Sequence, residues 1–257
     1  MKNVKAKKHY GQHFLTDRDV ASKIVDFLKL KEIDHVVELG PGMGVLTEFL
    51  LQKNIDCSFV EIDNESIEYL CNRFPNIREK IIGMDFLKVD IEEQFKGKIA
   101  IIGNFPYNIS SQILFKMLDY KDKILELVGM FQKEVADRIT SPPGSRVGGI
   151  LSIFVQAFYD TENLITLGPE SFSPPPKVNS SVIRLVRNSV EKLDCNEKQF
   201  TSIVKLTFNQ RRKMIRNSLK SFGNIDGFDS EFLTMRPEQL SVADFVRLTN
   251  QLEEFFK

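Results

Sequence analysis

The stretch Asn104-Phe105-Pro106-Tyr107 has the residue types and spacing best suited to chemistry in this sequence. An exocyclic amine on a nucleobase is a poor nucleophile because its lone pair is delocalised into the ring. The side-chain carbonyl of Asn104 and the backbone carbonyl of Pro106 can each accept one N–H, which favours a pyramidal nitrogen aimed at a methyl donor. Proline also fixes φ and removes a competing backbone donor. Tyr107 offers a ring for stacking an extruded base. Asn104, Pro106 and Tyr107 are the predicted catalytic residues, with a simple strand-end turn as the alternative.

A second group of residues predicts a nucleoside-binding site. The segment Glu38–Gly44 contains a GxGxG turn, whose glycines allow a sharp bend and the close approach of a ligand. Glu61 ends the next strand, where an acid accepts hydrogen bonds from two ribose hydroxyls. Asp85 follows the third strand and can accept from an adenine amine, with Met84 or Phe86 against the ring, although an N-cap is the commoner role. The Gly turn and Glu61 by themselves fit NAD as well as S-adenosylmethionine.

Alternating apolar runs and helical patterns must position these residues. Such alternation implies βαβ units and a doubly wound, mostly parallel α/β sheet of the Rossmann-like kind. Ligands of such sheets bind beyond the carboxyl ends of the strands, where the Gly turn lies. We expect strands at 35–39, 57–60, 80–83, 99–102 and 124–131, and helices at 45–52, 64–73 and 109–118.

The pattern changes after Gly149. A helix over 150–159 precedes two strands, 164–167 and 181–185, which read as a hairpin closing the sheet. Strands then disappear, and three helices are expected at 200–208, 212–222 and 242–256. The predicted domains are a basic N-terminal arm over 1–16, a methyltransferase domain over 17–190, and a small all-helical domain over 191–257.

Charge is balanced over the whole chain but not along it. The 35 Lys and Arg residues equal the 35 Asp and Glu residues, for a net charge of zero. Residues 1–16 carry four cations and residues 198–225 carry seven, and neither segment has an acid. Residues 17–197 have a net charge of −7 and residues 226–257 of −4. Two basic blocks flanking an acidic middle predict a nucleic-acid footprint on those blocks.

The remaining composition excludes several classes of protein. Three cysteines without metal-ligand spacing, Cys57, Cys71 and Cys195, indicate neither a disulfide framework nor a zinc site, so no metal is expected. We find neither a signal-peptide pattern nor an apolar run of about 18 residues that would span a membrane. A cytoplasmic setting is therefore expected. No motif demands a dimer, and a monomer is the working expectation.

Nearly the whole chain resembles the ribosomal RNA adenine N6-dimethyltransferase family that acts on small-subunit RNA. The resemblance is carried by Tyr10–Asp17, by Asn104–Tyr107 with Phe105 in place of the family's usual Leu, and by Phe172–Ser180. Phe208–Lys213 with its continuation to Lys220, and Glu238–Leu248, match the family's helical domain. The family often has Asn where His13 stands.

The resemblance implies roles for individual residues. It implies that S-adenosylmethionine contacts His13, Leu15, Gly40, Glu61, Asp85 and Asn104. Phe172 would help Tyr107 clamp the target base, with core packing as an equal alternative. In the helical domain, Arg212, Arg216 and Lys220 would follow one another along one helix face. The expected RNA-binding residues are Arg211, Arg212, Lys213, Arg216 and Lys220.

The activity implied is dimethylation at N6 of two adjacent adenines in the 3′-terminal hairpin loop of 16S ribosomal RNA, during maturation of the 30S particle. Three alternatives stay open. The related large-subunit methyltransferases share the Asn-x-Pro-Tyr motif, but the Gly11-Gln12 pair, the triple proline from Pro174 and Phe208–Lys213 favour the small subunit. A non-catalytic assembly factor would not need Glu61 and Asp85. An NAD-dependent oxidoreductase would need the GxGxxG spacing that this chain lacks.

Overall fold

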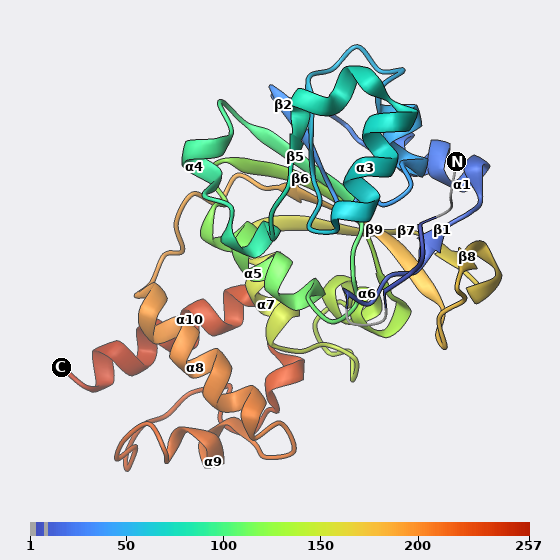
Figure 1. Ribbon diagram of the computed structural model, residues 1–257. Coiled ribbons are helices and arrows are strands. Elements are labelled where there is room, and N and C mark those ends of the chain that lie inside the picture. The colour runs from blue at the N-terminus through green and yellow to red at the C-terminus, as the bar shows by residue number, and fades with distance from the viewer. Residues whose placement is uncertain (1–3, 8–9) are drawn as a thin grey trace. The chain divides into compact units, whose positions relative to one another are not determined.

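The computed structural model describes residues 4–7 and 10–257, and the chain forms two compact units (Figure 1). The first unit comprises Met1–Ala136 together with Asp160–Arg187. The second comprises Asp137–Tyr159 together with Asn188–Lys257. The basic-arm residues Lys2 and Lys8 lie outside the described residues.

A seven-stranded sheet forms the centre of the first unit, in the order β4-β3-β2-β5-β6-β9-β7. The first five strands run parallel, and β9 is antiparallel to β6. The strands are β2 (His35–Leu39), β3 (Cys57–Val60), β4 (Ile81–Ile82), β5 (Ile99–Asn104), β6 (Ile124–Gln132), β7 (Tyr159–Leu167) and β9 (Ser180–Arg187). The α/β fold class predicted from the alternating pattern is confirmed.

The strand order reverses between β2 and β5. From β2 the chain moves outward to β3 and β4, and then returns to the other side of β2 at β5. Right-handed connections from these two strands place their helices on opposite faces, so a crevice opens at the carboxyl ends of β2 and β5. The connecting helices are α2 (Val45–Leu50), α3 (Asn64–Arg73), α4 (Ile91–Gln94) and α5 (Ser110–Asp119), with 3₁₀ turns η2 (Pro75–Lys80) and η3 (Phe86–Lys88).

Several short elements near the amino terminus are absent from the sequence-based prediction. β1 (Phe14–Leu15) pairs antiparallel with β8 (Phe172–Ser173), which follows the 3₁₀ turn η4 (Pro169–Ser171). A two-residue strand is too short to show a periodic pattern. The helices α1 (Arg18–Asp26), capped by the Asp17 carboxylate, and α6 (Lys133–Thr140) are also additional.

The second unit is helical, and its aromatic side chains show why it includes residues far apart in the sequence. Phe154 of α7 lies 6.3 Å from Phe200 of α8, and Phe200 meets Phe245 of α10 edge-on at 6.4 Å. These contacts bring 137–159, predicted to belong to the methyltransferase domain, into the helical unit, so that part of the predicted boundary is wrong. The elements are α7 (Ile150–Gln156), α8 (Glu197–Asn209), α9 (Ile215–Leu219), η5 (Pro237–Gln239) and α10 (Val242–Phe255).

Two helices are shorter in the structure than the sequence predicted. The helix expected over 150–159 stops at Gln156, because Tyr159 already begins β7. The helix expected over 212–222 shortens to α9, whose N-cap Met214 has no side-chain acceptor. Instead the amides of Ile215 and Arg216 donate to the carbonyls of Met235 and Leu233. Within the described residues, no helix is both long and apolar enough to cross a bilayer.

Candidate active site at the carboxyl ends of β2 and β5

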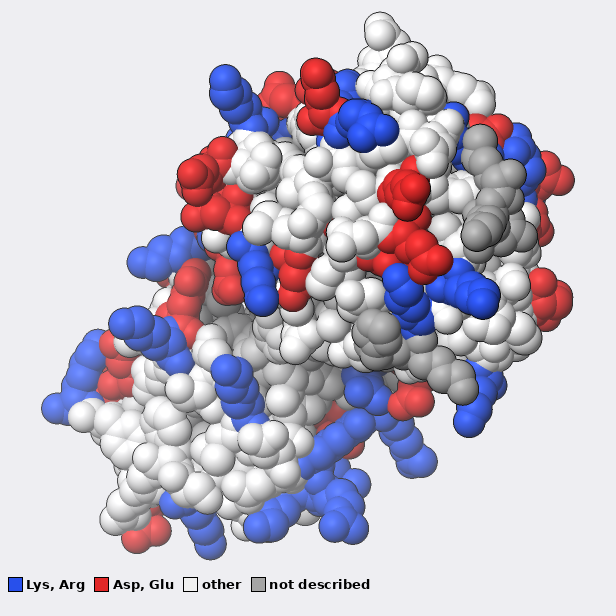
Figure 2. All heavy atoms as spheres, in the orientation of Figure 1, with Lys and Arg blue, Asp and Glu red and all other residues white. Residues whose placement is uncertain are grey.

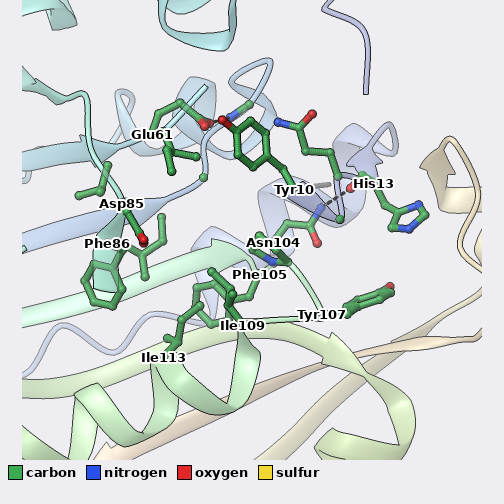
Figure 3. Close-up of a pocket in the computed structure, with 18 of the residues that line it drawn as sticks. Tyr10, His13, Glu61, Asp85, Phe86, Asn104, Phe105, Tyr107, Ile109 and Ile113 are labelled. Atoms are coloured by element: carbon green, nitrogen blue, oxygen red, sulfur yellow. Dashed lines mark hydrogen bonds between the residues drawn. The ribbon is translucent and has the colours of Figure 1, made fainter. Parts of the chain in front are cut away.

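A pocket opens at the predicted crevice of the first unit (Figure 3). Its empty space is about 790 Å³ including the open mouth, which lies in the range of small-molecule sites. Four segments that are distant in the sequence line it: the arm from Tyr10, the loop after β2, the ends of β3 and β4, and the loop after β5. The polar side chains among the lining residues include Tyr10, Gln12, His13, Glu61, Asp85, Asn104 and Tyr107.

The glycine turn has the backbone that its sequence requires. Gly40, Gly42 and Gly44 all have positive φ, between 56° and 76°, where a side chain would be strained. A Cβ on Gly42 would lie 2.8 Å from the Phe14 ring, whereas one on Gly40 would meet no atom within 4 Å. Gly40 therefore keeps an open backbone at the pocket, and Gly42 lets the amino-terminal segment pack against the turn.

Glu61 ties the glycine turn to the end of β3. Its carboxylate is buried and accepts hydrogen bonds from the backbone N–H of Gly42 at 3.0 Å and of Asp63 at 2.9 Å. Burial raises the pKa of Glu61, and these two amides oppose the rise. Since a carboxylate has about four acceptor sites, Glu61 retains capacity for the two hydroxyls of a ribose.

The amino-terminal arm is fastened beside this carboxylate. Lys7 donates to the Asp63 carboxylate and pairs with Glu65 at 3.1 Å, and Gln12 Nε2 donates to Asp63 at 3.4 Å. Burial raises the pKa of Asp63, but the hydrogen bonds outweigh it and the net pKa is lowered. Lys7 is thus paired inside the first unit, and the RNA footprint predicted for residues 1–16 stays a prediction.

Asp85 has the N-cap role in the structure, and its predicted contact with an adenine amine stays a prediction. It is the N-cap of η3, where Oδ1 accepts from the Leu87 N–H at 3.0 Å. It also lines the pocket, between Met84 and Phe86 (Figure 3). The cap fixes the carboxylate at the rim, and the flanking apolar side chains provide surfaces for a flat ring.

The orientation of the Asn104 amide is set by a residue 91 positions earlier. Its Nδ2 donates to the backbone carbonyl of His13 at 2.6 Å. Only the NH₂ end of an amide can donate to a carbonyl, so Oδ1 is the end left for a ligand. Asn104 lies at the centre of the pocket view, between Asp85 and Tyr107 (Figure 3).

The rest of the motif supports this amide. The Pro106 carbonyl accepts from the Ile109 N–H at 3.2 Å, which leaves a second lone pair. The Tyr107 hydroxyl shares a hydrogen bond of 2.6 Å with Ser180 of β9. Burial raises the pKa of Tyr107, and the Ser180 bond opposes this. The ring is therefore anchored at its hydroxyl and only partly covered.

Phe105 is the buried residue of the Asn104–Tyr107 motif. It is 1% exposed and meets Phe131 edge-on at 5.2 Å. The ring fits because Gly103 and Gly129, which face each other on β5 and β6, have no side chains: a Cβ on either would lie within 2.8 Å of the ring. Sequence reasoning missed both glycines, although a glycine inside an apolar strand signals close packing.

Three predicted contact residues have other contacts in the structure. The His13 ring lines the pocket and stacks 5.7 Å from Tyr107 (Figure 3). Its Nδ1 donates to the Pro174 carbonyl at 2.7 Å. Leu15 and Phe172 are register partners in β1 and β8, are 3% and 4% exposed, and belong to the hydrophobic core. Neither lines the main pocket, so core packing is the role that the structure gives Phe172.

The basic residues of the second unit are not equivalent. Arg211 donates to the Arg146 carbonyl and lies 3.8 Å from Glu238, so it helps hold the unit together. Arg212 and Lys213 are exposed in the turn before α9 rather than on its helix, which corrects the predicted row along one face. Figure 2 shows Lys and Arg side chains gathered at the lower end of this unit, with few acids among them. Arg216 and Lys220 are also exposed.

The model of the family described as ribosomal RNA adenine dimethylase matches residues 3–254. The chain belongs to this family. The Ribosomal RNA small subunit methyltransferase A of Cytophaga hutchinsonii is 53% identical over 256 residues, which cover 98% of this chain and 99% of that protein. The same-named protein of Flavobacterium johnsoniae is 52% identical over 255 residues, 98% of each chain.

Solved structures agree with this fold. A dimethyladenosine transferase from Plasmodium falciparum has a TM-score of 0.79 at 23% identity, over 94% of this chain and 98% of that one. The 23S rRNA methyltransferase ErmE has a TM-score of 0.71 at 26% identity, over 93% of this chain and 99% of that one. The family resemblance inferred from the motifs is confirmed by the family model and by the two relatives that are more than 50% identical. Among the residues that the structure describes, no three metal-ligating side chains come together.

Proposed function

We propose that this ribosomal RNA adenine dimethylase transfers methyl groups from S-adenosylmethionine to N6 of two adjacent adenines in the 3′-terminal hairpin loop of 16S ribosomal RNA. The observation that carries the proposal is the Asn104 amide, whose NH₂ end is bound by the His13 carbonyl at 2.6 Å. A fixed Oδ1 is the acceptor that a nucleobase amine requires, and it lies in the same pocket as Glu61, the acid proposed for the cofactor's ribose.

The residues present fit this cofactor. Gly40 has an open backbone, Glu61 has spare acceptor sites for a ribose diol, and Asp85 stands beside two apolar side chains at the rim. When bound, the cofactor supplies a methyl group on a positively charged sulfur. Direct transfer from sulfur to nitrogen needs no metal, and none is included in the proposal.

The chain's own residues would prepare the target amine. Asn104 Oδ1 and the Pro106 carbonyl each accept one N–H, so the lone pair is turned toward the methyl group. Tyr107, held at its hydroxyl by Ser180, stacks the extruded base. The nitrogen becomes cationic on methylation and loses its proton to water, so no side chain has to act as a base.

The RNA is proposed to contact exposed cations of the second unit. Single-stranded loops are the usual targets of base-specific RNA recognition because their bases can leave the stack. Arg212, Lys213, Arg216 and Lys220 are exposed and can pair with phosphates. We further propose that a monomer acts in the cytoplasm, on an immature 30S particle rather than on free RNA.

The test is methyl transfer from labelled S-adenosylmethionine to immature small subunits, followed by nucleoside analysis. Wild type should yield N6,N6-dimethyladenosine. Asn104→Ala should lower kcat about 100-fold, the order seen when one transition-state hydrogen bond is removed, and should leave RNA binding intact. Asn54→Ala, at an exposed position away from the pocket, is the matched control.

Three outcomes would count against the proposal. Near wild-type turnover in Asn104→Ala would remove the proposed amine contact. With total ribosomal RNA from a strain that lacks the enzyme as substrate, label appearing in 23S instead of 16S RNA would assign the chain the substrate named for the ErmE neighbour. A wild-type protein that binds RNA but no S-adenosylmethionine would be an assembly factor.

A further inference from the structure

Lys116 of α5 makes contacts that the proposed reaction does not explain. Its ammonium donates to the backbone carbonyls of Leu87 at 3.0 Å and Val89 at 2.5 Å. These carbonyls lie at the carboxyl end of η3, a single 3₁₀ turn. The last carbonyls of a helical turn have no partner inside the turn and favour a cation. Lys116 therefore serves as the C-terminal cap of η3.

The same ammonium also supports a ring of the pocket. It lies 5.2 Å from the centroid of the Phe86 ring, within the range of a cation–π contact. Phe86 is a lining residue of the pocket, and so is Asp85, which caps the other end of the turn through the Leu87 N–H. One short turn is thus held at its start by Asp85 and at its end by Lys116.

Charge and burial are consistent with a structural cation at this position. Burial lowers the pKa of Lys116, and the carboxylates of Asp85, Asp90 and Asp119 oppose that change. A second ring, Tyr120 at the end of α5, lies 5.9 Å from the ammonium. The net pKa of Lys116 stays lowered, so these acceptors and rings offset only part of the cost of burying its charge.

We propose that Lys116 is a positioning residue for the adenine ring of the cofactor. This positioning role rests on the proposed function, in which the part of the pocket beside Asp85 is the adenine subsite. By fixing the carbonyl end of η3 and the Phe86 ring, Lys116 sets the distance between the Asp85 carboxylate and the apolar surface on which adenine lies. Its effect is on cofactor binding, because Asn104 and Tyr107 belong to the separate loop after β5.

The experiment compares Lys116→Met, Lys116→Arg and Lys88→Met with wild type by calorimetry with S-adenosylhomocysteine and by methyl-transfer kinetics. Lys116→Met should raise Kd and the KM for S-adenosylmethionine about tenfold, no more than the effect of losing one charged hydrogen bond, with kcat at saturation unchanged. Lys116→Arg should recover most of the affinity. Lys88 lies exposed in the same turn, and its replacement should change neither constant.

A second ligand separates positioning from general loss of structure. S-inosylhomocysteine has a carbonyl in place of the adenine amine, so Asp85 loses the hydrogen-bond donor at that position of the ring. Wild type should prefer the adenosyl ligand, and Lys116→Met should lose most of that preference. In an Asp85→Ala background, Lys116→Met should add little further loss.

Each outcome has a distinct meaning. A wild type that binds neither ligand would overturn the proposed function. A Lys116→Met protein that binds both ligands like wild type, or loses affinity for both equally, would overturn the positioning role alone. A fall in kcat with unchanged KM would also overturn it.

Discussion

Gly129 of β6 offers the sharpest test of how the Asn104 loop is held. A Cβ at this position would lie 2.1 Å from Cε2 of Phe105, far closer than two carbon atoms approach. Phe105 is 1% exposed and packs against Phe131, so the ring has no empty space to enter. Gly129→Ala therefore overpacks the core under the catalytic motif.

The magnitude follows from two opposing effects. Replacing glycine by alanine restricts the unfolded chain and stabilises by about 0.4–1 kcal/mol. Overpacking a buried site costs about 1–3 kcal/mol, and an overlap this deep belongs in the upper half of that range. We expect Gly129→Ala to lower the free energy of unfolding by about 1–2 kcal/mol. Because Phe105 joins Asn104 to Pro106, a shift of about 1 Å in the loop should reduce kcat by up to about 100-fold.

A second substitution isolates the cause. Phe105→Leu removes the ring atoms that the new Cβ would strike, so it should restore about 1 kcal/mol in the Gly129→Ala background. Gly103→Ala is the comparison variant: its Cβ would lie 2.8 Å from the Phe105 ring but also 2.6 Å from the Leu39 carbonyl oxygen, so shortening Phe105 should rescue it only in part. That oxygen is part of the β2 backbone and stays in place when Phe105 is shortened.

Urea unfolding and methyl transfer would be measured for all single and double variants. The reasoning fails if Gly129→Ala unfolds within about 0.3 kcal/mol of wild type, the ordinary scatter between independent sites. It also fails if Phe105→Leu rescues Gly103→Ala as well as it rescues Gly129→Ala.

Three further changes test other contacts. Lys7→Met should weaken S-adenosylhomocysteine binding by calorimetry, at most about fivefold, since the ion pair with Asp63 is partly exposed and screened by solvent. Burial raises the pKa of Glu38 from 4.5 to about 8, so the native state keeps a proton that the unfolded chain releases above pH 4.5. The unfolding free energy of wild type should therefore fall, relative to Glu38→Gln, by up to about 1.4 kcal/mol per pH unit between pH 5 and pH 8. Arg212→Gln combined with Lys213→Gln should reduce the slope of log K against log salt for RNA binding by about 1.4, or about 0.7 per single-stranded phosphate contact.

The controls use neighbouring side chains. Lys5→Met, at an exposed position of the arm, should leave cofactor affinity unchanged, and an equal loss there would remove the role given to Lys7. Parallel pH curves for Glu38→Gln and wild type would show that Glu38 titrates normally. Arg211→Gln should alter stability more than the salt slope, because Arg211 lies beside Glu238. An unchanged slope in the double variant would move the RNA footprint elsewhere.

The sequence predicted those residues of the site that lie at strand ends. A parallel sheet brings the carboxyl ends of its strands to one edge, so Gly40 after β2 and Asn104 at the end of β5 had to be neighbours once the alternating pattern was recognised. The short range of such signals also explains what they left open. Leu15 and Phe172 lie in motifs that match the family, and their two-residue strands pair with each other and turn both side chains into the core. The cofactor contact of Leu15 stays a prediction.

The sequence by itself therefore determined the fold class, the pocket and the identity of the amine-binding motif, because these follow from local periodicity and from residue types at strand ends. Tertiary structure decided how each group is used. The carbonyl of His13, rather than its ring, orients Asn104, and paired glycines on β5 and β6 make room for Phe105. Lys7 forms an ion pair with Asp63. Each of these depends on contacts between residues far apart in the chain, which no local pattern records.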